Sequence, residues 1–94
     1  MIFESIKESQ KPNKKLVITF SDPNLIIHFG SKNSNTYLDH KDKKIRQNYI
    51  NRHETNENWD EVNAGSLSRF ILWGSSTKLE TNLLNYLKKF NIKY

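Results

Sequence analysis

The segment KKLVITFSDPNLIIHFG, residues 14–30, constrains the fold more than any other part of the chain. Leu16, Ile18 and Phe20 occupy alternate positions in it, which is the two-residue period of a β-strand. The SDPN segment that follows favours a turn, because Pro fixes φ while Asp and Asn bond to nearby backbone. A second apolar run, LIIHFG, comes directly after this turn. We therefore predict a β-hairpin over residues 15–30.

The pattern after the hairpin changes to the period of helices. Asp39 stands where the N-cap of a helix belongs, and Asp42 follows three positions later, a carboxylate variant of the capping box. Ile45 and Tyr49 then fall on one helical face. These features predict a helix over residues 39–53.

Two further helices are expected in the C-terminal half of the chain. Asn63 can cap a helix over residues 64–73, which carries an apolar stripe. Thr77 and Glu80 have the spacing of a capping box and predict a helix over residues 78–90.

The length of the chain limits it to one small core. A chain of 94 residues is near the low end of what folds alone, and this one has no cysteine with which a disulfide could add stability. The N-terminal segment, residues 1–14, is left open between an edge strand, a short helix and a loosely ordered stretch. We predict a single α+β domain, residues 1–94, in which the hairpin, with or without a third edge strand, packs against three helices.

The chain is basic, with a formal charge of +5, but this charge is unevenly distributed. Residues 54–63 hold four acidic residues and no base, between two segments in which Lys and Arg dominate. Such a chain is dipolar, whereas a nucleic-acid-binding protein more often has one continuous basic face. No signal peptide is recognisable, and no segment approaches the roughly 18 apolar residues of a membrane span. We expect a protein that is neither secreted nor embedded in a membrane.

Arg, His and Trp residues are concentrated between His40 and Trp73. A metal site there is disfavoured, because His40 and His53 would lie roughly 20 Å apart on one helix at 1.5 Å per residue. Ligand spacing of the i, i+4 kind is absent, as are a phosphate loop, a nucleophile elbow and a Cys/His pair. We therefore expect no enzyme, no catalytic residues, no metal and no cofactor.

A surface for nucleic acid or a protein partner is the second hypothesis for the conspicuous residues. The cations of the first and last helices suit phosphate contacts, and exposed aromatic rings would stack on bases. These cations are Lys41, Lys43, Lys44, Arg46, Lys88 and Lys89. The alternative is an ordinary solvated helix face with ion pairs such as Asp39–Lys43 and Asp42–Arg46.

A third hypothesis gives the cluster a structural role. A buried Trp needs an acceptor for its indole N–H, and the planar fork of an Arg suits a carboxylate such as Glu57, Asp60 or Asp42. An Arg over a Trp ring adds cation–π attraction. We predict a network that ties the acidic connection to two helices, made up of Asp42, Tyr49, Arg52, His53, Trp59, Arg69 and Trp73.

The motifs HFGSKNSNTYLDHKD, YINRH, ENW and AGSLSRFILW resemble a small family of uncharacterised proteins encoded by nucleocytoplasmic large DNA viruses. The resemblance spans about residues 15–90 and rests on the spacing of HKD, RH, W and LSR-x-x-LW. The chain departs from the family pattern after Trp73, where GSS replaces the usual NKP and indicates a looser turn.

The resemblance implies a viral origin and no assigned catalytic activity. The leading hypothesis is a non-enzymatic structural or interaction protein that associates with the virion, as a minor capsid or internal component, and binds other viral proteins through exposed aromatic side chains. The alternative is a basic accessory protein that binds DNA or RNA during viral genome handling. Either role would be carried out in the virion or in the viral factory of the host cytoplasm.

Overall fold

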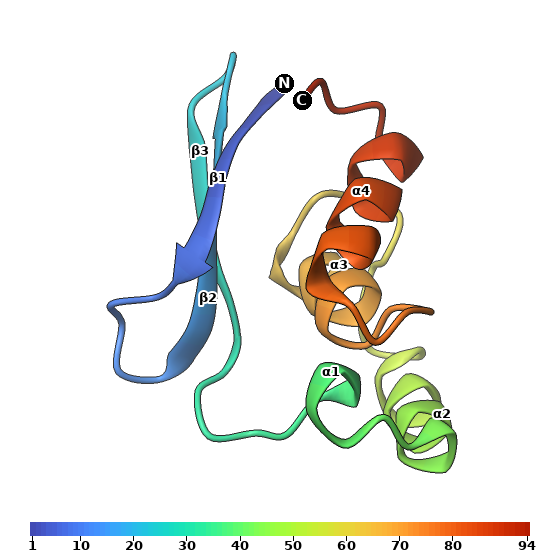
Figure 1. The fold of residues 1–94 in the computed structure, drawn as a ribbon. Coiled ribbons are helices and arrows are strands. Elements are labelled where there is room, and N and C mark those ends of the chain that lie inside the picture. Colours follow the sequence, from blue (N-terminus) through green and yellow to red (C-terminus); the bar gives the residue numbers. More distant parts are fainter.

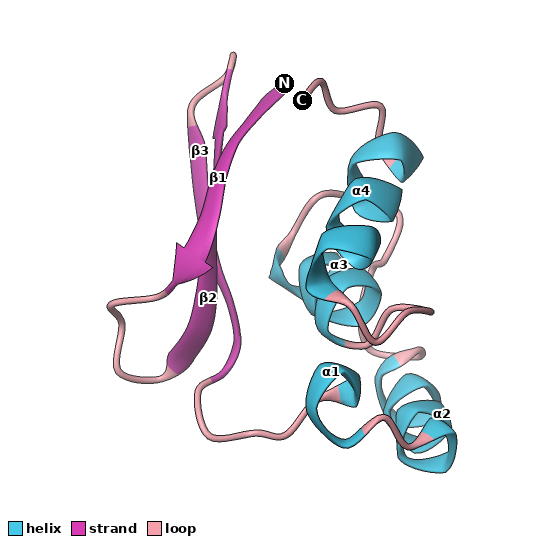
Figure 2. Ribbon diagram, viewed as in Figure 1, coloured by secondary structure: helices cyan, strands magenta, loops and turns pink.

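The computed structural model describes residues 1–94 as two layers, a β-sheet and a group of helices (Figure 1). The antiparallel sheet has the strand order β1-β2-β3, with β1 (Ile2–Glu8), β2 (Lys14–Ser21) and β3 (Leu25–Ser31). The helices lie against one face of this sheet, and no helix covers the other face (Figure 2). The prediction of an α+β fold is confirmed.

Strands β2 and β3 form the predicted hairpin. Alternate residues of the two strands pair with one another and pack on the core: Leu16 with Phe29, Ile18 with Ile27 and Phe20 with Leu25. In the turn between the strands, Asp22 adopts a φ of 53°. Asp is among the few residues other than Gly that visit this left-handed region routinely.

The N-terminal segment adds β1 at the edge of the sheet, so a loosely ordered or helical segment there is wrong. Phe3 pairs with Phe20 and Ile6 with Ile18, although residues three apart on a regular strand would face opposite sides. A register shift between Phe3 and Ser5, a β-bulge, accommodates the extra residue. Both Phe3 and Ile6 therefore pack on the core.

The single helix predicted over residues 39–53 is wrong. The chain instead forms α1 (Tyr37–His40) and α2 (Lys43–His53). Lys41, between them, adopts a φ of 59°, a left-handed conformation through which a right-handed helix does not continue.

The two acidic residues expected in one capping box serve two separate helices. Thr36 is the N-cap of α1, and the Asp39 carboxylate accepts the backbone N–H of Thr36 at 2.8 Å. Asp42 is the N-cap of α2 and accepts the backbone N–H groups of Lys44 and Ile45 at 2.9 and 3.2 Å. Asp42 thus satisfies two helix-terminal donors and does not pair with an Arg.

The helix predicted over residues 64–73 begins as expected. Asn63 caps α3 (Ala64–Leu67), its Oδ1 accepting the Ser66 N–H at 2.8 Å. The chain then widens into the π-helical turn η1 (Ser68–Leu72), where the Trp73 N–H reaches the Ser68 carbonyl at 3.0 Å.

The last helix, α4 (Leu79–Lys89), agrees with the range predicted for it, but its start differs. The capping box of Thr77 and Glu80 is not formed, and Lys78 is the N-cap without a side-chain cap. A different interaction holds the turn before α4.

Asn82 makes this interaction. Its side chain is 1% exposed; its Oδ1 accepts the Ser76 N–H at 3.0 Å, and its Nδ2 donates to the carbonyls of Ile71 and Ser76 at 2.9 and 2.8 Å. The turn between η1 and α4 is therefore held from the body of α4 and leaves no role for the Thr77 hydroxyl.

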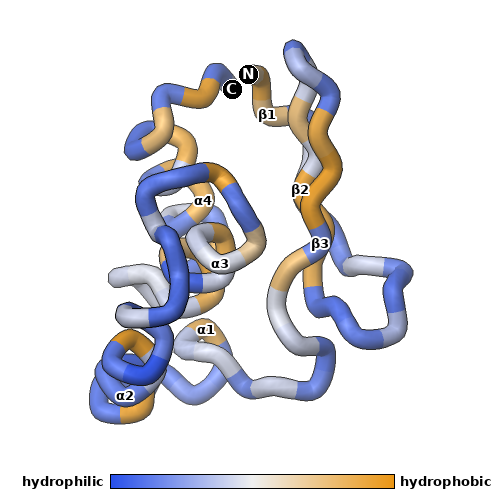
Figure 3. The backbone as a smooth tube through the Cα atoms, turned by 180° about the vertical axis from the view of Figure 1, so that it is seen from behind, coloured by the Kyte–Doolittle hydropathy of each residue, from blue (hydrophilic) through white to orange (hydrophobic).

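The core fills the space between the two layers, and Figure 3 shows the hydrophobic residues concentrated along β2 and in the helices. Its largest fully buried apolar side chains come from both layers: Ile18, Phe20, Phe29, Leu67, Ile71, Tyr86 and Leu87. The C-terminal end returns to β1, where Lys93 exchanges backbone hydrogen bonds with Met1 and Phe3 at 3.1 and 2.7 Å. The two termini therefore lie side by side (Figure 1).

Candidate functional site

An aromatic column joins α2 to the end of η1. Trp73 stacks on Tyr49 with ring centroids 4.3 Å apart and planes 3° from parallel. Tyr49 stacks in turn on His53, one helical turn later, at 4.2 Å. Both Trp73 and Tyr49 are buried. Three members of the predicted network thus form a packing contact between two helical segments.

Glu57, in the acidic connection, supplies the carboxylate at one end of this column. Its Oε2 lies 2.6 Å from His53 Nδ1, and its Oε1 accepts the indole N–H of Trp59 at 2.8 Å. A Cβ at Gly65 would lie 3.1 Å from Glu57 Oε1, so the side chain fits closely against α3. The connection is therefore tied to α2 by one carboxylate, which also packs against α3.

The predicted pairing of Arg residues with carboxylates is wrong. Only His53 and Glu57 make a side-chain ion-pair contact, so no Lys or Arg of the chain is paired with an Asp or Glu. Arg52 is exposed and makes no side-chain hydrogen bond. Arg69 donates instead to the Trp73 carbonyl at 2.9 Å and lies over the Trp59 ring, 5.2 Å from its centroid.

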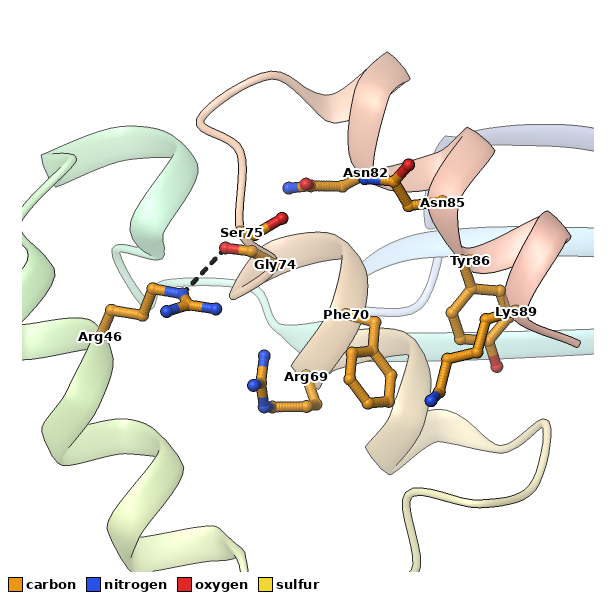
Figure 4. A pocket seen from close by; sticks show the side chains of 9 residues that line it. All are labelled: Arg46, Arg69, Phe70, Gly74, Ser75, Asn82, Asn85, Tyr86 and Lys89. Atoms are coloured by element: carbon orange, nitrogen blue, oxygen red, sulfur yellow. Dashed lines mark hydrogen bonds between the residues drawn. The ribbon is translucent and has the colours of Figure 1, made fainter.

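Arg46, on α2, binds the same stretch of backbone. Its Nε donates to the Trp73 carbonyl at 3.1 Å. It also donates to the Gly74 carbonyl at 2.9 Å (Figure 4). These carbonyls follow the end of η1, where a helix leaves acceptors unsatisfied and where cations are favoured. Arg46 and Arg69 are thus positioned by the helix end and not by acidic side chains.

A cavity of about 230 Å³ opens beside these two guanidinium groups (Figure 4). It lies between α2, η1, the turn after η1 and α4, and its lining contains no carboxylate. The lining residues are Arg46, Arg69, Phe70, Gly74, Ser75, Asn82, Asn85, Tyr86 and Lys89. We call this cavity the cationic pocket, because three of its nine residues are Lys or Arg and none is acidic.

The two Arg residues of the cationic pocket are half-buried and have no acidic residue beside them in the lining. Burial, reinforced by the nearby Arg46 guanidinium, lowers the pKa of Arg69, while Tyr49 and Glu54 oppose that shift. The Nε atom of Arg69 is buried without a hydrogen-bond partner. The Lys89 ammonium and the Arg69 guanidinium each lie 4.9 Å from the centroid of Phe70. Two cations therefore flank one aromatic ring.

Comparison with known proteins adds a family but no activity. A family of unknown function (DUF5754) matches residues 4–53, which is more than half of the chain. The chain belongs to this family. No curated protein and no solved structure matches it. The matched residues comprise most of the sheet, α1 and α2, so the family region contributes Arg46 to the cationic pocket, while Arg69 and Lys89 lie beyond it.

The predicted nucleic-acid residues are divided by the fold. Arg46 and Lys89 both line the cationic pocket although they come from different helices. The other four, Lys41, Lys43, Lys44 and Lys88, are exposed and unpaired. Lys43 precedes Arg46 by three residues on α2, so it flanks the pocket residue on the same side of that helix. The ion pairs Asp39–Lys43 and Asp42–Arg46 are not formed.

The three histidines have separate environments. His28 on β3 hydrogen-bonds through Nδ1 to Ser9 Oγ at 2.7 Å, and burial, with Lys11 and Lys14, lowers its pKa. His40 packs against Trp73, at 5.3 Å between ring centroids. No three His, Asp or Glu side chains lie close enough together to hold a metal ion. No helix has both the length and the apolar character to cross a membrane.

Arg69 is the pocket residue that sequence reasoning misplaced. It was predicted to pair with a carboxylate, whereas it lines a cavity together with Arg46 and Lys89. These three cations are far apart in the sequence, and no spacing connects them. Phe70 was expected only as part of an apolar helical stripe and Ser75 only as part of a turn, and nothing in the sequence singled out Asn85.

Proposed function

We propose that this chain is a non-enzymatic protein that binds nucleic acid through its helical layer, with the cationic pocket as the main contact to phosphate. One observation supports the proposal: three cations from three segments surround a cavity whose lining holds no carboxylate. Arg46 and Arg69 are half-buried, and such cations in proteins are normally balanced by acidic groups. A site built from unbalanced cations suits an anionic ligand, and polyanionic nucleic acid is the ligand that the exposed Lys side chains around it also favour.

The surrounding surface extends the contact along α2. Lys43 and Lys44 are exposed at its start, three and two residues before Arg46, and Lys88 adjoins Lys89 on α4. None of these cations is engaged by an acidic side chain. Helices α2 and α4, which both line the pocket, therefore carry further exposed cations.

A role in binding other viral proteins is the second candidate, as a minor capsid or internal virion component. This role was expected to use exposed aromatic side chains, but Trp73 and Tyr49 are buried and Trp59 is half-buried. Tyr94 is the exposed aromatic residue, at 66%. The viral setting implied by the sequence resemblance suits both candidates, since genome handling and assembly share the virion and the viral factory.

The test is a titration with short single-stranded and duplex DNA and RNA at two salt concentrations. Each phosphate neutralised should add about 0.7 to the slope of log K against log salt for single strands and about 0.9 for B-DNA. Lys43→Glu combined with Lys89→Glu should abolish binding. Lys7→Glu combined with Lys11→Glu changes the charge equally at exposed positions of the N-terminal region and should reduce affinity far less. Absence of binding at low salt, or equal losses in the two double variants, would refute the proposal.

A further inference from the structure

We propose that the cationic pocket receives the terminal phosphate of a nucleic-acid strand, a phosphomonoester, in preference to a phosphodiester within the strand. The inference rests on the proposed function and names the part of the ligand that the pocket selects. A surface that follows a backbone needs cations in a row along a groove. Here Arg46, Arg69 and Lys89 instead surround one cavity of about 230 Å³, reached from α2, η1 and α4 (Figure 4).

The two guanidinium groups are held in place before any ligand binds. Arg46 Nε and Arg69 Nη1 both donate to the Trp73 carbonyl, at 3.1 and 2.9 Å, and Arg46 Nε also donates to Gly74 at 2.9 Å. These hydrogen bonds use one of the three nitrogens of each guanidinium group. The terminal nitrogens of Arg46 have no acceptor on the protein. Donors that are oriented but unsatisfied suit an oxyanion with several acceptor oxygens.

The charge of a terminal phosphate matches the pocket better than that of a diester. A monoester carries between one and a half and two negative charges near neutral pH and offers three terminal oxygens. A diester carries one charge and offers two such oxygens. The pocket presents three cations and no carboxylate, so the monoester leaves less uncompensated charge. It would also relieve the repulsion between Arg46 and Arg69.

The rim of the pocket contributes neutral donors. Asn82 has its amide fully engaged by Ile71 and Ser76, so it supports the wall. Ser75 and Asn85 line the pocket and make no side-chain hydrogen bond within the protein. A hydroxyl and an amide at the rim suit the ester oxygen and the sugar hydroxyls that follow a terminal phosphate. Gly74 beside them has no space for a side chain, because a Cβ would lie 2.3 Å from the Phe70 carbonyl oxygen.

The experiment measures the affinity of the full chain for one labelled oligonucleotide in three forms: with a 5′-phosphate, with a 3′-phosphate and with hydroxyls at both ends. One of the phosphorylated forms should bind about tenfold more tightly than the hydroxyl form, as expected for added charge-assisted hydrogen bonds. Inorganic phosphate should compete with the phosphorylated oligonucleotide and reduce its advantage. The form that binds more tightly shows whether the pocket prefers a 5′ or a 3′ terminal phosphate.

Two variants keep the test independent of folding. Asn85→Asp places a carboxylate in the pocket at an exposed position and should remove the preference for a phosphorylated end. Asn33→Asp makes the same change at an exposed position in the loop after β3, outside the pocket lining, and should preserve the preference. Both variants should melt at the temperature of the parent.

The outcomes separate the inference from the function. Equal affinity for all three oligonucleotides, with binding retained, overturns the terminal-phosphate inference and leaves nucleic-acid binding intact. No binding of any form overturns both. Tighter binding of a phosphoserine peptide than of the phosphorylated oligonucleotide overturns the nucleic-acid assignment and shows that the pocket serves a modified protein.

Discussion

Trp73 and Tyr49 stack face to face, with their ring centroids 4.3 Å apart and their planes 3° from parallel. This contact joins the end of η1 to α2, and those two segments supply Arg69 and Arg46 to the cationic pocket. The backbone carbonyl of Trp73 accepts hydrogen bonds from both Arg side chains. One residue therefore fixes the packing of the helices with its ring and the orientation of the pocket cations with its backbone.

Replacing Trp73 by Ala should lower the free energy of unfolding by about 3–5 kcal/mol, as truncation of a buried aromatic side chain usually does. So small a domain has only about 5–15 kcal/mol in total. Denaturant unfolding followed by circular dichroism measures the change. Trp59→Ala is the matched control, because Trp59 is only half-buried, and it should cost distinctly less. Equal stability of Trp73→Ala and the parent would show that the stacked pair is not part of the core.

Replacing Glu57 by Gln and by Ala should separate its two contacts. Gln keeps an oxygen that can accept the Trp59 indole N–H but loses the charge that faces His53 Nδ1. Ala loses both contacts and leaves the indole N–H without a partner. We expect a loss of about 1 kcal/mol for Gln and about 2 kcal/mol for Ala, measured by denaturant unfolding. The reverse order would mean that Glu57 does not hold the acidic connection.

The hairpin was predictable because its signal is local. Alternation at Leu16, Ile18 and Phe20 depends on near neighbours alone, and the face it predicts is the face that is buried. In β1 the same rule fails, since the bulge after Phe3 changes the phase before Ile6. The position of a β-bulge depends on how the strand pairs with its partner, so the sequence of β1 alone does not reveal it.

The break between α1 and α2 was hidden for a related reason. Asp39 and Asp42 are both good helix-capping residues, and local propensity does not decide which of them begins the helix. Tertiary packing decides it, because Thr36 and Tyr37 are buried at 1% and 5% exposure and hold α1 against the core. The cationic pocket was hidden more completely, since only the fold brings its three cations together.

Asp42 forms a helix cap in the structure and Thr77 does not, so the loss of each side chain should affect stability differently. Asp42→Ala should lower the free energy of unfolding by about 1 kcal/mol, because it leaves two N–H groups at the start of α2 without their acceptor. Thr77→Ala should change it by less than about 0.5 kcal/mol, because the Thr77 hydroxyl makes no cap. Thermal unfolding of both variants in one buffer provides the comparison. A Thr77→Ala cost as large as that of Asp42→Ala would restore the Thr77–Glu80 capping box.

Alkaline pH should destabilise the protein through its buried tyrosines. Burial raises the pKa of Tyr86 to about 12, against a hydrogen bond from Ser66 that lowers it, whereas a tyrosine in an unfolded chain ionises near pH 10.

Between about pH 10 and about pH 12 the unfolded chain has released a proton that the folded chain keeps. Unfolding then releases protons, so the free energy of unfolding falls as the pH rises through this interval and is unaffected below it. Burial also raises the pKa of Tyr49 to about 12, so two side chains contribute. The measurement is the melting temperature as a function of pH, compared between the parent and Tyr86→Phe. The variant starts from lower stability because it loses the bond to Ser66, but its decline above about pH 10 should be shallower. Parallel declines would show that Tyr86 ionises as easily in the folded protein as in the unfolded chain.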